Sequence, residues 1–135
     1  PLEEITREIH PMPGLHRTLH RLDGKKVLFT NSPSAYALAL LEALEIADSF
    51  DAVFSVEDVD LQPKPSIAAY RTLLRRLRLK PHQCVMVEDS SHNLLPAKRL
   101  GMKTVWLRRN ARRDPAVDIL IRNLSDLPSR QPRRP

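Results

Sequence analysis

The chain has 135 residues, of which 41% are hydrophobic and 28% are charged, and these values fit one globular domain around one core. No apolar run approaches the roughly 20 residues of a membrane-spanning helix, and the N-terminus lacks the basic and apolar regions of a signal peptide. We therefore expect a soluble, cytoplasmic protein with no membrane partner.

Short apolar runs alternate with helical patterns along the chain. Leu15, Leu19 and Leu22 recur at helical spacing before a turn at residues 23–24. The predicted strands span residues 27–29, 52–54, 84–87, 103–107 and, at a sheet edge, 118–121. The predicted helices span residues 34–46, 66–79 and 93–100, the last ending at Gly101. Short apolar strands that alternate with helices predict an α/β fold with a parallel sheet covered on both faces.

Two serines and the only cysteine have simple structural interpretations. Ser34 and Ser66 precede helical patterns, so each is predicted to cap a helix N-terminus. Cys84 has no second cysteine to pair with, and it adjoins the apolar run 85–87. A buried structural thiol is therefore expected at this position.

The net charge of +6 raises the question of nucleic-acid binding. The arginines are spread along the chain: four between residues 71 and 78 fall on the polar face of a predicted helix, four between 108 and 113 follow a strand, and three between 130 and 134 lie in a proline-interrupted tail. Only 4% of the residues are aromatic and could stack on bases. Both observations argue against a nucleic-acid partner.

Three polar stretches follow the carboxyl ends of strands or lead between them, where open α/β sheets bind ligands. In the first, Thr30, Asn31 and Ser32 lie between a predicted strand and a predicted helix. A threonine hydroxyl and successive backbone N–H groups can converge on an anion there. Helix capping alone also explains such a turn, and both interpretations remain open.

The second stretch places Lys64 between Pro63 and Pro65. The two prolines restrict the backbone and remove competing N–H donors, so the ammonium group is aimed in one direction. An exposed lysine in a proline turn is the alternative.

The third stretch begins with Glu88 and Asp89, directly after the predicted strand 84–87. Adjacent carboxylates repel each other unless a cation neutralises them, and carboxylate oxygens suit Mg²⁺. The pair could instead stabilise the N-terminus of the following helix through its dipole.

Taken together, FTNS (29–32), KP (64–65) and VEDSSHNLLPAKRLGMKTVW (87–106) resemble the second, third and fourth motifs of the haloacid dehalogenase superfamily. Members of this superfamily are Mg²⁺-dependent phosphohydrolases with an aspartyl nucleophile. The resemblance covers about residues 12–107, and the pattern is most similar to the pyrimidine 5′-nucleotidase branch. It implies that Thr30 and Asn31 bind the phosphoryl group, and that Lys64 neutralises phosphate charge and holds the nucleophile's carboxylate.

The same resemblance implies that Asp89 and Glu88 coordinate Mg²⁺, with Ser90 and Asn93 supporting their loop. It implies a three-layer α/β/α, Rossmann-like core at residues 25–128. Residues 1–24 resemble the remnant of a helical cap, and residues 129–135 are expected to form a disordered basic tail.

The sequence departs from the family pattern in one respect. Family members open with a strand that ends in Asp-x-Asp, whose first aspartate attacks phosphorus. Asp23 precedes a strand instead of following one, and Asp58 and Asp60 lie in the segment that leads to Lys64, so neither position suits a nucleophile. We therefore expect a partial chain that lacks the first strand and most of the cap and supplies no nucleophile of its own.

The expected activity of the intact protein is hydrolysis of a small phosphorylated metabolite, with nucleoside 5′-monophosphates as the leading class. Phosphoglycolate or a sugar phosphate is the alternative substrate, and a non-enzymatic remnant or binding module is the alternative function. The 135 residues alone are expected to be inactive and prone to aggregate, because two apolar strands would each expose an unpaired edge. A direct pairing of those two strands would remove the exposed edges. The oligomeric state stays open.

Overall fold

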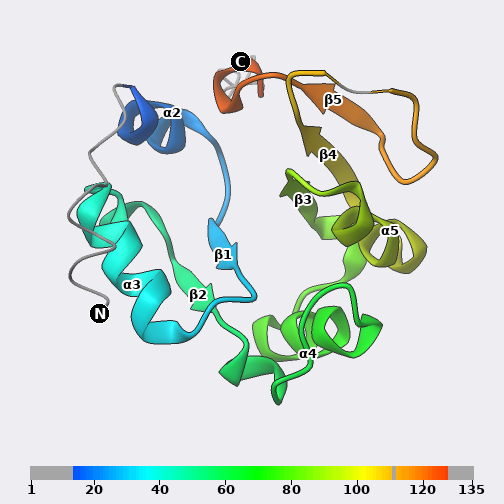
Figure 1. Ribbon diagram of the computed structural model, residues 1–135, viewed down its shortest axis with the longest axis horizontal. Coiled ribbons are helices and arrows are strands. Elements are labelled where there is room, and N and C mark those ends of the chain that lie inside the picture. Colours follow the sequence, from blue (N-terminus) through cyan, green and yellow to red (C-terminus); the bar gives the residue numbers. More distant parts are fainter. Residues whose placement is uncertain (1–13, 111, 128–135) are drawn as a thin grey trace, which may run out of the picture. The chain divides into compact units, whose positions relative to one another are not determined.

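The strands of the protein pair in parallel, as the alternating pattern predicts. The computed structural model describes residues 14–110 and 112–127. In one sheet β1 (Val27–Phe29) pairs with β2 (Ala52–Phe54), and in a second sheet β3 (Val85–Glu88), β4 (Lys103–Leu107) and β5 (Ile119–Ile121) follow in that order (Figure 1). The predicted α/β class is therefore confirmed.

The chain divides after Asp58 into two compact units. In the N-terminal unit, α2 (Leu15–Arg21) and α3 (Ser34–Ala43) accompany β1 and β2. In the C-terminal unit, residues 59–127, α4 (Ile67–Leu77) and α5 (Ser91–Leu100) accompany β3, β4 and β5. Single 3₁₀ turns lie at Ala47–Ser49, Glu57–Val59, Pro81–Gln83 and Leu124–Asp126. Residues 129–135, predicted to form a tail, and the first 13 residues of the predicted cap remnant lie outside the described residues.

The core of the N-terminal unit contains the leucines that the helical spacing singles out. Leu19, Leu41 and Ile46 are buried together, and Leu15 and Leu22 pack against them. The amphipathic pattern before the turn at residues 23–24 is therefore a helix that buries its apolar face.

The core of the C-terminal unit lies between its sheet and α5. Leu94, Trp106 and Ala116 are buried in one cluster, and α5 packs on β3 and β4. Gly101 ends α5 with a φ of 103°, and the N–H of Met102 donates to the carbonyl of Ala97. This reversal of the chain needs a residue with positive φ, which explains the glycine.

The two predicted serine caps do not form. Ser34 is the first residue of α3, and its backbone N–H donates to the Glu57 carboxylate at 3.0 and 3.2 Å. Ser66 occupies the N-cap position of α4, but its side chain makes no capping hydrogen bond. A carboxylate distant in sequence thus takes over the role predicted for Ser34.

The predicted burial of the third strand is also wrong. Val85 is 61% exposed, and no residue of β3 is fully buried. β3 is hydrogen-bonded to β4, and its other edge has no strand partner among the described residues. Cys84 is half-buried instead of buried, and this partial burial raises the pKa of its thiol.

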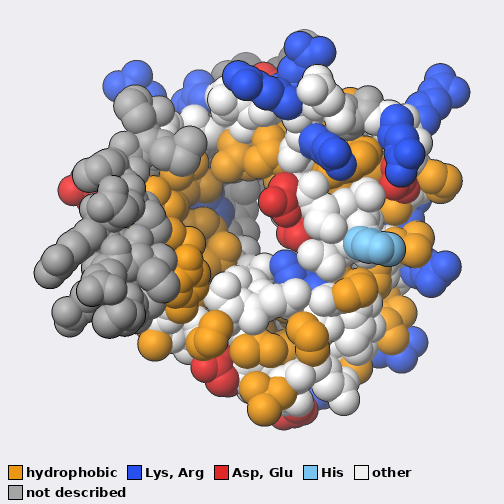
Figure 2. Space-filling model, viewed as in Figure 1, with side chains coloured by type: hydrophobic (Ala, Val, Ile, Leu, Met, Phe, Trp, Pro, Cys, Tyr) orange, Lys and Arg blue, Asp and Glu red, His pale blue; other side chains and the backbone are white. Residues whose placement is uncertain are grey.

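The surface agrees with the distribution of charge along the sequence. Figure 2 shows Lys and Arg side chains at several separate places on one face, with hydrophobic and uncharged atoms between them. Within the described part of the chain, no helix is long and apolar enough to cross a membrane.

Asp118 ties β4 to the entry of β5 and to α5. Its carboxylate accepts hydrogen bonds from the backbone N–H of Thr104 at 2.8 Å and from the Thr104 hydroxyl at 3.2 Å, and it pairs with Lys98 of α5. The Lys98 hydrogen bond and the Thr104 backbone hydrogen bond lower the pKa of Asp118 from 3.8 to about 2. The charged form is therefore the one that the folded protein stabilises.

We expect Asp118→Asn to lower the free energy of unfolding by about 1 kcal/mol at pH 7. The lost hydrogen bonds have a charged acceptor, which strengthens them, but the carboxylate is close to solvent, which weakens them. A carboxyl with a depressed pKa stabilises the fold above its unfolded pKa near 4 and loses this effect as the pH falls through about 2. Urea denaturation followed by fluorescence of Trp106, the single tryptophan, measures this at pH 7, 4 and 2. The exposed Asp60→Asn is the control, and a difference from wild type that is the same at all three pH values would contradict the prediction.

Candidate active site

The predicted phosphate cradle lies in the N-terminal unit, directly after β1. The N–H of Thr30 continues the ladder to the carbonyl of Phe54 at 2.9 Å, and the N–H of Ser32 donates to the Thr30 hydroxyl at 3.1 Å. Thr30 is half-buried and Asn31 is exposed. The strand end and the turn thus fix the hydroxyl of Thr30, and phosphate binding here stays a prediction.

The predicted lysine and one of the predicted carboxylates meet inside the C-terminal unit. Lys64 is only 7% exposed, and its Nζ lies 3.5 Å from Oε2 of Glu88, at the carboxyl end of β3. A buried ammonium group needs a nearby anion, because the loss of its hydration is otherwise uncompensated. The alternative of an exposed lysine in a proline turn is therefore wrong.

Two further residues hold Glu88 in place. Nδ2 of Asn93 donates to Oε1 of Glu88 at 2.8 Å, and the fully buried Tyr70 donates its hydroxyl to the carbonyl of Asn93. The pKa of Tyr70 is raised mainly by burial and to a lesser extent by the nearby charge of Glu88. The phenol therefore stays protonated and keeps its role as a donor. Asn93 thus contacts Glu88, and its predicted role of supporting the metal loop stays a prediction.

Asp89 has a different environment from its neighbour Glu88. It is exposed, and its backbone carbonyl accepts a hydrogen bond of 2.8 Å from Nε1 of Trp106 on β4. Ser90 is the N-cap residue of α5 but makes no side-chain capping bond. The loop is thus anchored through its backbone, and the Asp89 carboxylate faces solvent.

The two carboxylates of this loop are enough for Mg²⁺ only if water and substrate oxygens complete its coordination. Mg²⁺ is often held by one or two carboxylates together with water and substrate phosphate, and Asp89 and Glu88 supply two. Glu88 already faces the Lys64 ammonium and Asn93, which leaves Asp89 as the more accessible ligand. No group of three or more His, Cys, Asp or Glu side chains suited to a metal occurs among residues 14–110 and 112–127.

The aspartates outside this cluster have local structural roles or lie at the surface. Asp58 accepts hydrogen bonds from the N–H and the hydroxyl of Ser55 at 2.8 and 2.9 Å, and Asp23 accepts one from the N–H of Gly24. Asp60 is exposed with a φ of 54° in the turn after Val59. These contacts give Asp23 and Asp58 local structural roles, and the absence of a nucleophile from the chain stays a prediction.

Sequence reasoning missed Trp106 and Tyr70 as parts of this cluster. The sequence places Trp106 in a predicted strand and at the end of the third motif stretch, whereas in the structure it is the register partner of Glu88 and holds the Asp89 carbonyl. Tyr70 falls in the predicted helix 66–79 with no role at the site. Neither role leaves a local sequence pattern, because each depends on a segment at least 17 residues away.

We expect Glu88→Gln to lower the free energy of unfolding by about 3 kcal/mol, because it removes the carboxylate charge that faces the buried Lys64 ammonium group at 3.5 Å. Urea denaturation monitored through Trp106 measures the change. Adding Lys64→Met to Glu88→Gln is expected to recover at least half of the loss, because it also removes the buried ammonium charge that Glu88 faced. If Glu88→Gln is no more harmful than the exposed control Asp60→Asn, the pair does not stabilise this unit.

Comparison with known proteins gives relatives of one chemical type. The chain is 30% identical over 123 residues to phosphoglycolate phosphatase of Escherichia coli (strain K12), covering 85% of this chain and 48% of that protein. It is 29% identical over 119 residues to validoxylamine A 7′-phosphate phosphatase of Streptomyces hygroscopicus subsp. limoneus, covering 84% and 55%. The chain therefore spans about half the length of these curated relatives.

The solved structures and the family pattern agree with these relatives. The crystal structure of a HAD phosphatase from Thermococcus onnurineus superposes with a TM-score of 0.78 at 31% identity, covering 91% of this chain and 59% of that one. The sequence pattern of haloacid dehalogenase-like hydrolases matches residues 2–101. Because this match includes most of the chain, the protein belongs to the haloacid dehalogenase-like hydrolase family.

Proposed function

We propose that the protein takes part in Mg²⁺-dependent hydrolysis of small phosphate monoesters. The observation that carries this proposal is the buried Lys64–Glu88 pair beside the exposed Asp89 at the carboxyl end of β3. Ligands of open α/β sheets bind at such strand ends. A fixed cation next to an accessible carboxylate is suited to a phosphate and its metal ion.

In this proposal Asp89 is the main protein ligand of Mg²⁺, and Glu88 takes a lesser share because Lys64 and Asn93 already engage its two oxygens. The bound metal would neutralise charge on the phosphoryl oxygens. Trp106 holds the Asp89 backbone, so the ligand would be positioned before the substrate binds.

Lys64 and the loop after β1 have the other proposed roles. The Lys64 ammonium group would neutralise phosphate charge, and its low exposure would strengthen that interaction relative to water. Thr30 and Asn31 would donate hydrogen bonds to the phosphoryl oxygens. Ser90 and Asn93 would support the metal loop without touching the substrate.

We propose that the nucleophile comes from outside these 135 residues, because in the Asp-x-Asp that follows β2, Asp58 is engaged by Ser55 and Asp60 lies in a turn on the way to Lys64. We expect the chain alone to release no phosphate, and an extended chain that adds an Asp-x-Asp strand to do so. If the extended chain is also inactive while ligand binding persists, a binding module is the better description.

The substrate class is a further part of the proposal. The names of two relatives refer to phosphoglycolate and to a 7′-phosphate, and these favour an acidic or sugar-like phosphate. A nucleoside 5′-monophosphate, the leading class from the sequence motifs, stays a prediction. The cytoplasmic location also stays a prediction.

We expect Asp89→Asn to weaken the binding of divalent metal at least tenfold, because it removes the charge of the accessible ligand. The measurement uses the 135-residue protein with Mn²⁺ as a paramagnetic substitute, and electron paramagnetic resonance counts the free ion. Asp60→Asn is the control for the loss of one negative charge. Equal Mn²⁺ binding by wild type and Asp89→Asn would exclude Asp89 as a ligand.

In the extended chain, Lys64→Ala is expected to lower kcat/KM for phosphate monoesters more than tenfold, which corresponds to ~1.4 kcal/mol of transition-state stabilisation. Phosphate release with Mg²⁺ measures the effect, and circular dichroism checks that the variant is folded. A folded variant that loses less than tenfold would leave Lys64 with a structural role only.

A further inference from the structure

Four arginines gather around one cavity of the C-terminal unit. The cavity has a volume of about 700 Å³, and Arg108, Arg109, Arg112 and Arg122 contribute to its lining. Its lining includes no aspartate or glutamate, and none of these four arginines forms an ion pair within the described part of the chain. We call this cavity the arginine pocket.

The parallel sheet explains why these arginines meet. Arg108 follows the last residue of β4, and Arg122 follows the last residue of β5. The N–H of Arg108 donates to the carbonyl of Ile121 at 2.9 Å, which keeps the two strand ends together. Ser91, the first residue of α5, also lines the pocket. The pocket therefore lies at the carboxyl edge of the sheet, where such folds bind ligands.

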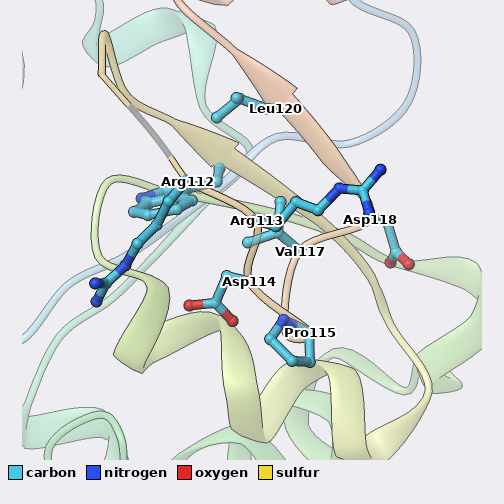
Figure 3. A pocket seen from close by; sticks show the side chains of 8 residues that line it. Arg112, Arg113, Asp114, Pro115, Val117, Asp118 and Leu120 are labelled. Carbon is cyan, nitrogen blue, oxygen red and sulfur yellow. The ribbon is translucent and has the colours of Figure 1, made fainter.

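A neighbouring cavity of about 710 Å³ shares Trp106, Arg112 and Leu120 with the arginine pocket, and Figure 3 shows the residues around it. Its acidic residues are already engaged. Asp118 binds Lys98 and Thr104, and Asp114 accepts a hydrogen bond of 2.8 Å from the N–H of Ala116. These two aspartates therefore do not neutralise the positive charge of the arginine pocket, which is available to an external anion.

Trp106 connects the arginine pocket to the candidate active site. It lines the pocket, its indole N–H donates to the Asp89 carbonyl at 2.8 Å, and it is the register partner of Glu88. The guanidinium carbon of Arg108 lies 5.3 Å from the centre of the Trp106 ring, a distance typical of a cation–π contact. Because neighbouring strands lie about 4.8 Å apart, a short molecule can reach from Asp89 into the pocket.

We propose that the arginine pocket binds a second anionic group, a carboxylate or a second phosphate, on a substrate whose phosphoryl group lies at Asp89 and Lys64. Guanidinium groups bind both kinds of anion in a bidentate manner. The position of the phosphoryl group rests on the proposed function, whereas the charge of the pocket does not. The substrate class is then a short phosphate ester with a second acidic group, which the pocket would bind more tightly than a nucleoside 5′-monophosphate.

The test compares two phosphate esters that differ in one acidic group. 2-Phosphoglycolate carries a carboxylate, and ethyl phosphate of similar size does not. Each is titrated into the 135-residue protein in EDTA, and the single indole N–H resonance, that of Trp106, reports binding. We expect 2-phosphoglycolate to bind at least tenfold more tightly than ethyl phosphate, and uridine 5′-monophosphate to resemble ethyl phosphate.

The variant Arg109→Gln/Arg122→Gln is expected to reduce that ratio to below threefold, and Arg109→Lys/Arg122→Lys to keep part of it. The control Arg71→Gln/Arg75→Gln removes the same charge from exposed positions of α4 and is expected to keep the full ratio. An equal ratio in the pocket variant and the control, or no preference in the wild type, would overturn the proposal. Lys64→Ala is expected to weaken both esters alike, so a failed phosphoryl site is distinguished from a failed arginine pocket.

Discussion

The ion pair between Lys64 and Glu88 is the constraint on which the rest of the C-terminal unit depends. An ammonium group that is only 7% exposed requires an anion, and Glu88 supplies it from the end of β3. Asn93 and Tyr70 then fix Glu88 from α5 and α4. One charge interaction therefore joins the segment before α4, the third strand and both helices of this unit.

The ion pair with Lys64 gives the two adjacent carboxylates, Glu88 and Asp89, different environments. Glu88 faces buried partners, while Asp89 is exposed and its backbone carbonyl is held by Trp106. Mutual repulsion, which the sequence suggests for adjacent acids, is relieved for Glu88 by a lysine 24 positions earlier in the chain. The family membership and the proposed metal role of Asp89 are compatible with this division, because Mg²⁺ needs few protein ligands.

The pairing of the strands also changes how some of the arginines are distributed in space. In the sequence, four arginines between residues 108 and 113 belong to a loop, and Arg122 directly follows a short edge strand. Parallel pairing brings Arg108 and Arg122 to the same edge of the sheet, and the loop adds Arg109 and Arg112 around one cavity. Four of the dispersed arginines thus meet around one cavity near the loop that carries Asp89, while the other basic residues stay spread over the surface.

The sequence by itself determined the strands and helices, the parallel sheet and the three motifs, because apolar periodicity and strand-to-helix turns are local properties. It also identified the haloacid dehalogenase-like family from residues that stand at strand ends. Only the tertiary structure decided that Glu57 and not the Ser34 side chain serves the start of α3, that Val85 is exposed, and that Glu88 and not Asp89 faces Lys64. Each of these contacts depends on which segments, distant in sequence, pair with each other and in which register. Local sequence patterns do not contain this information.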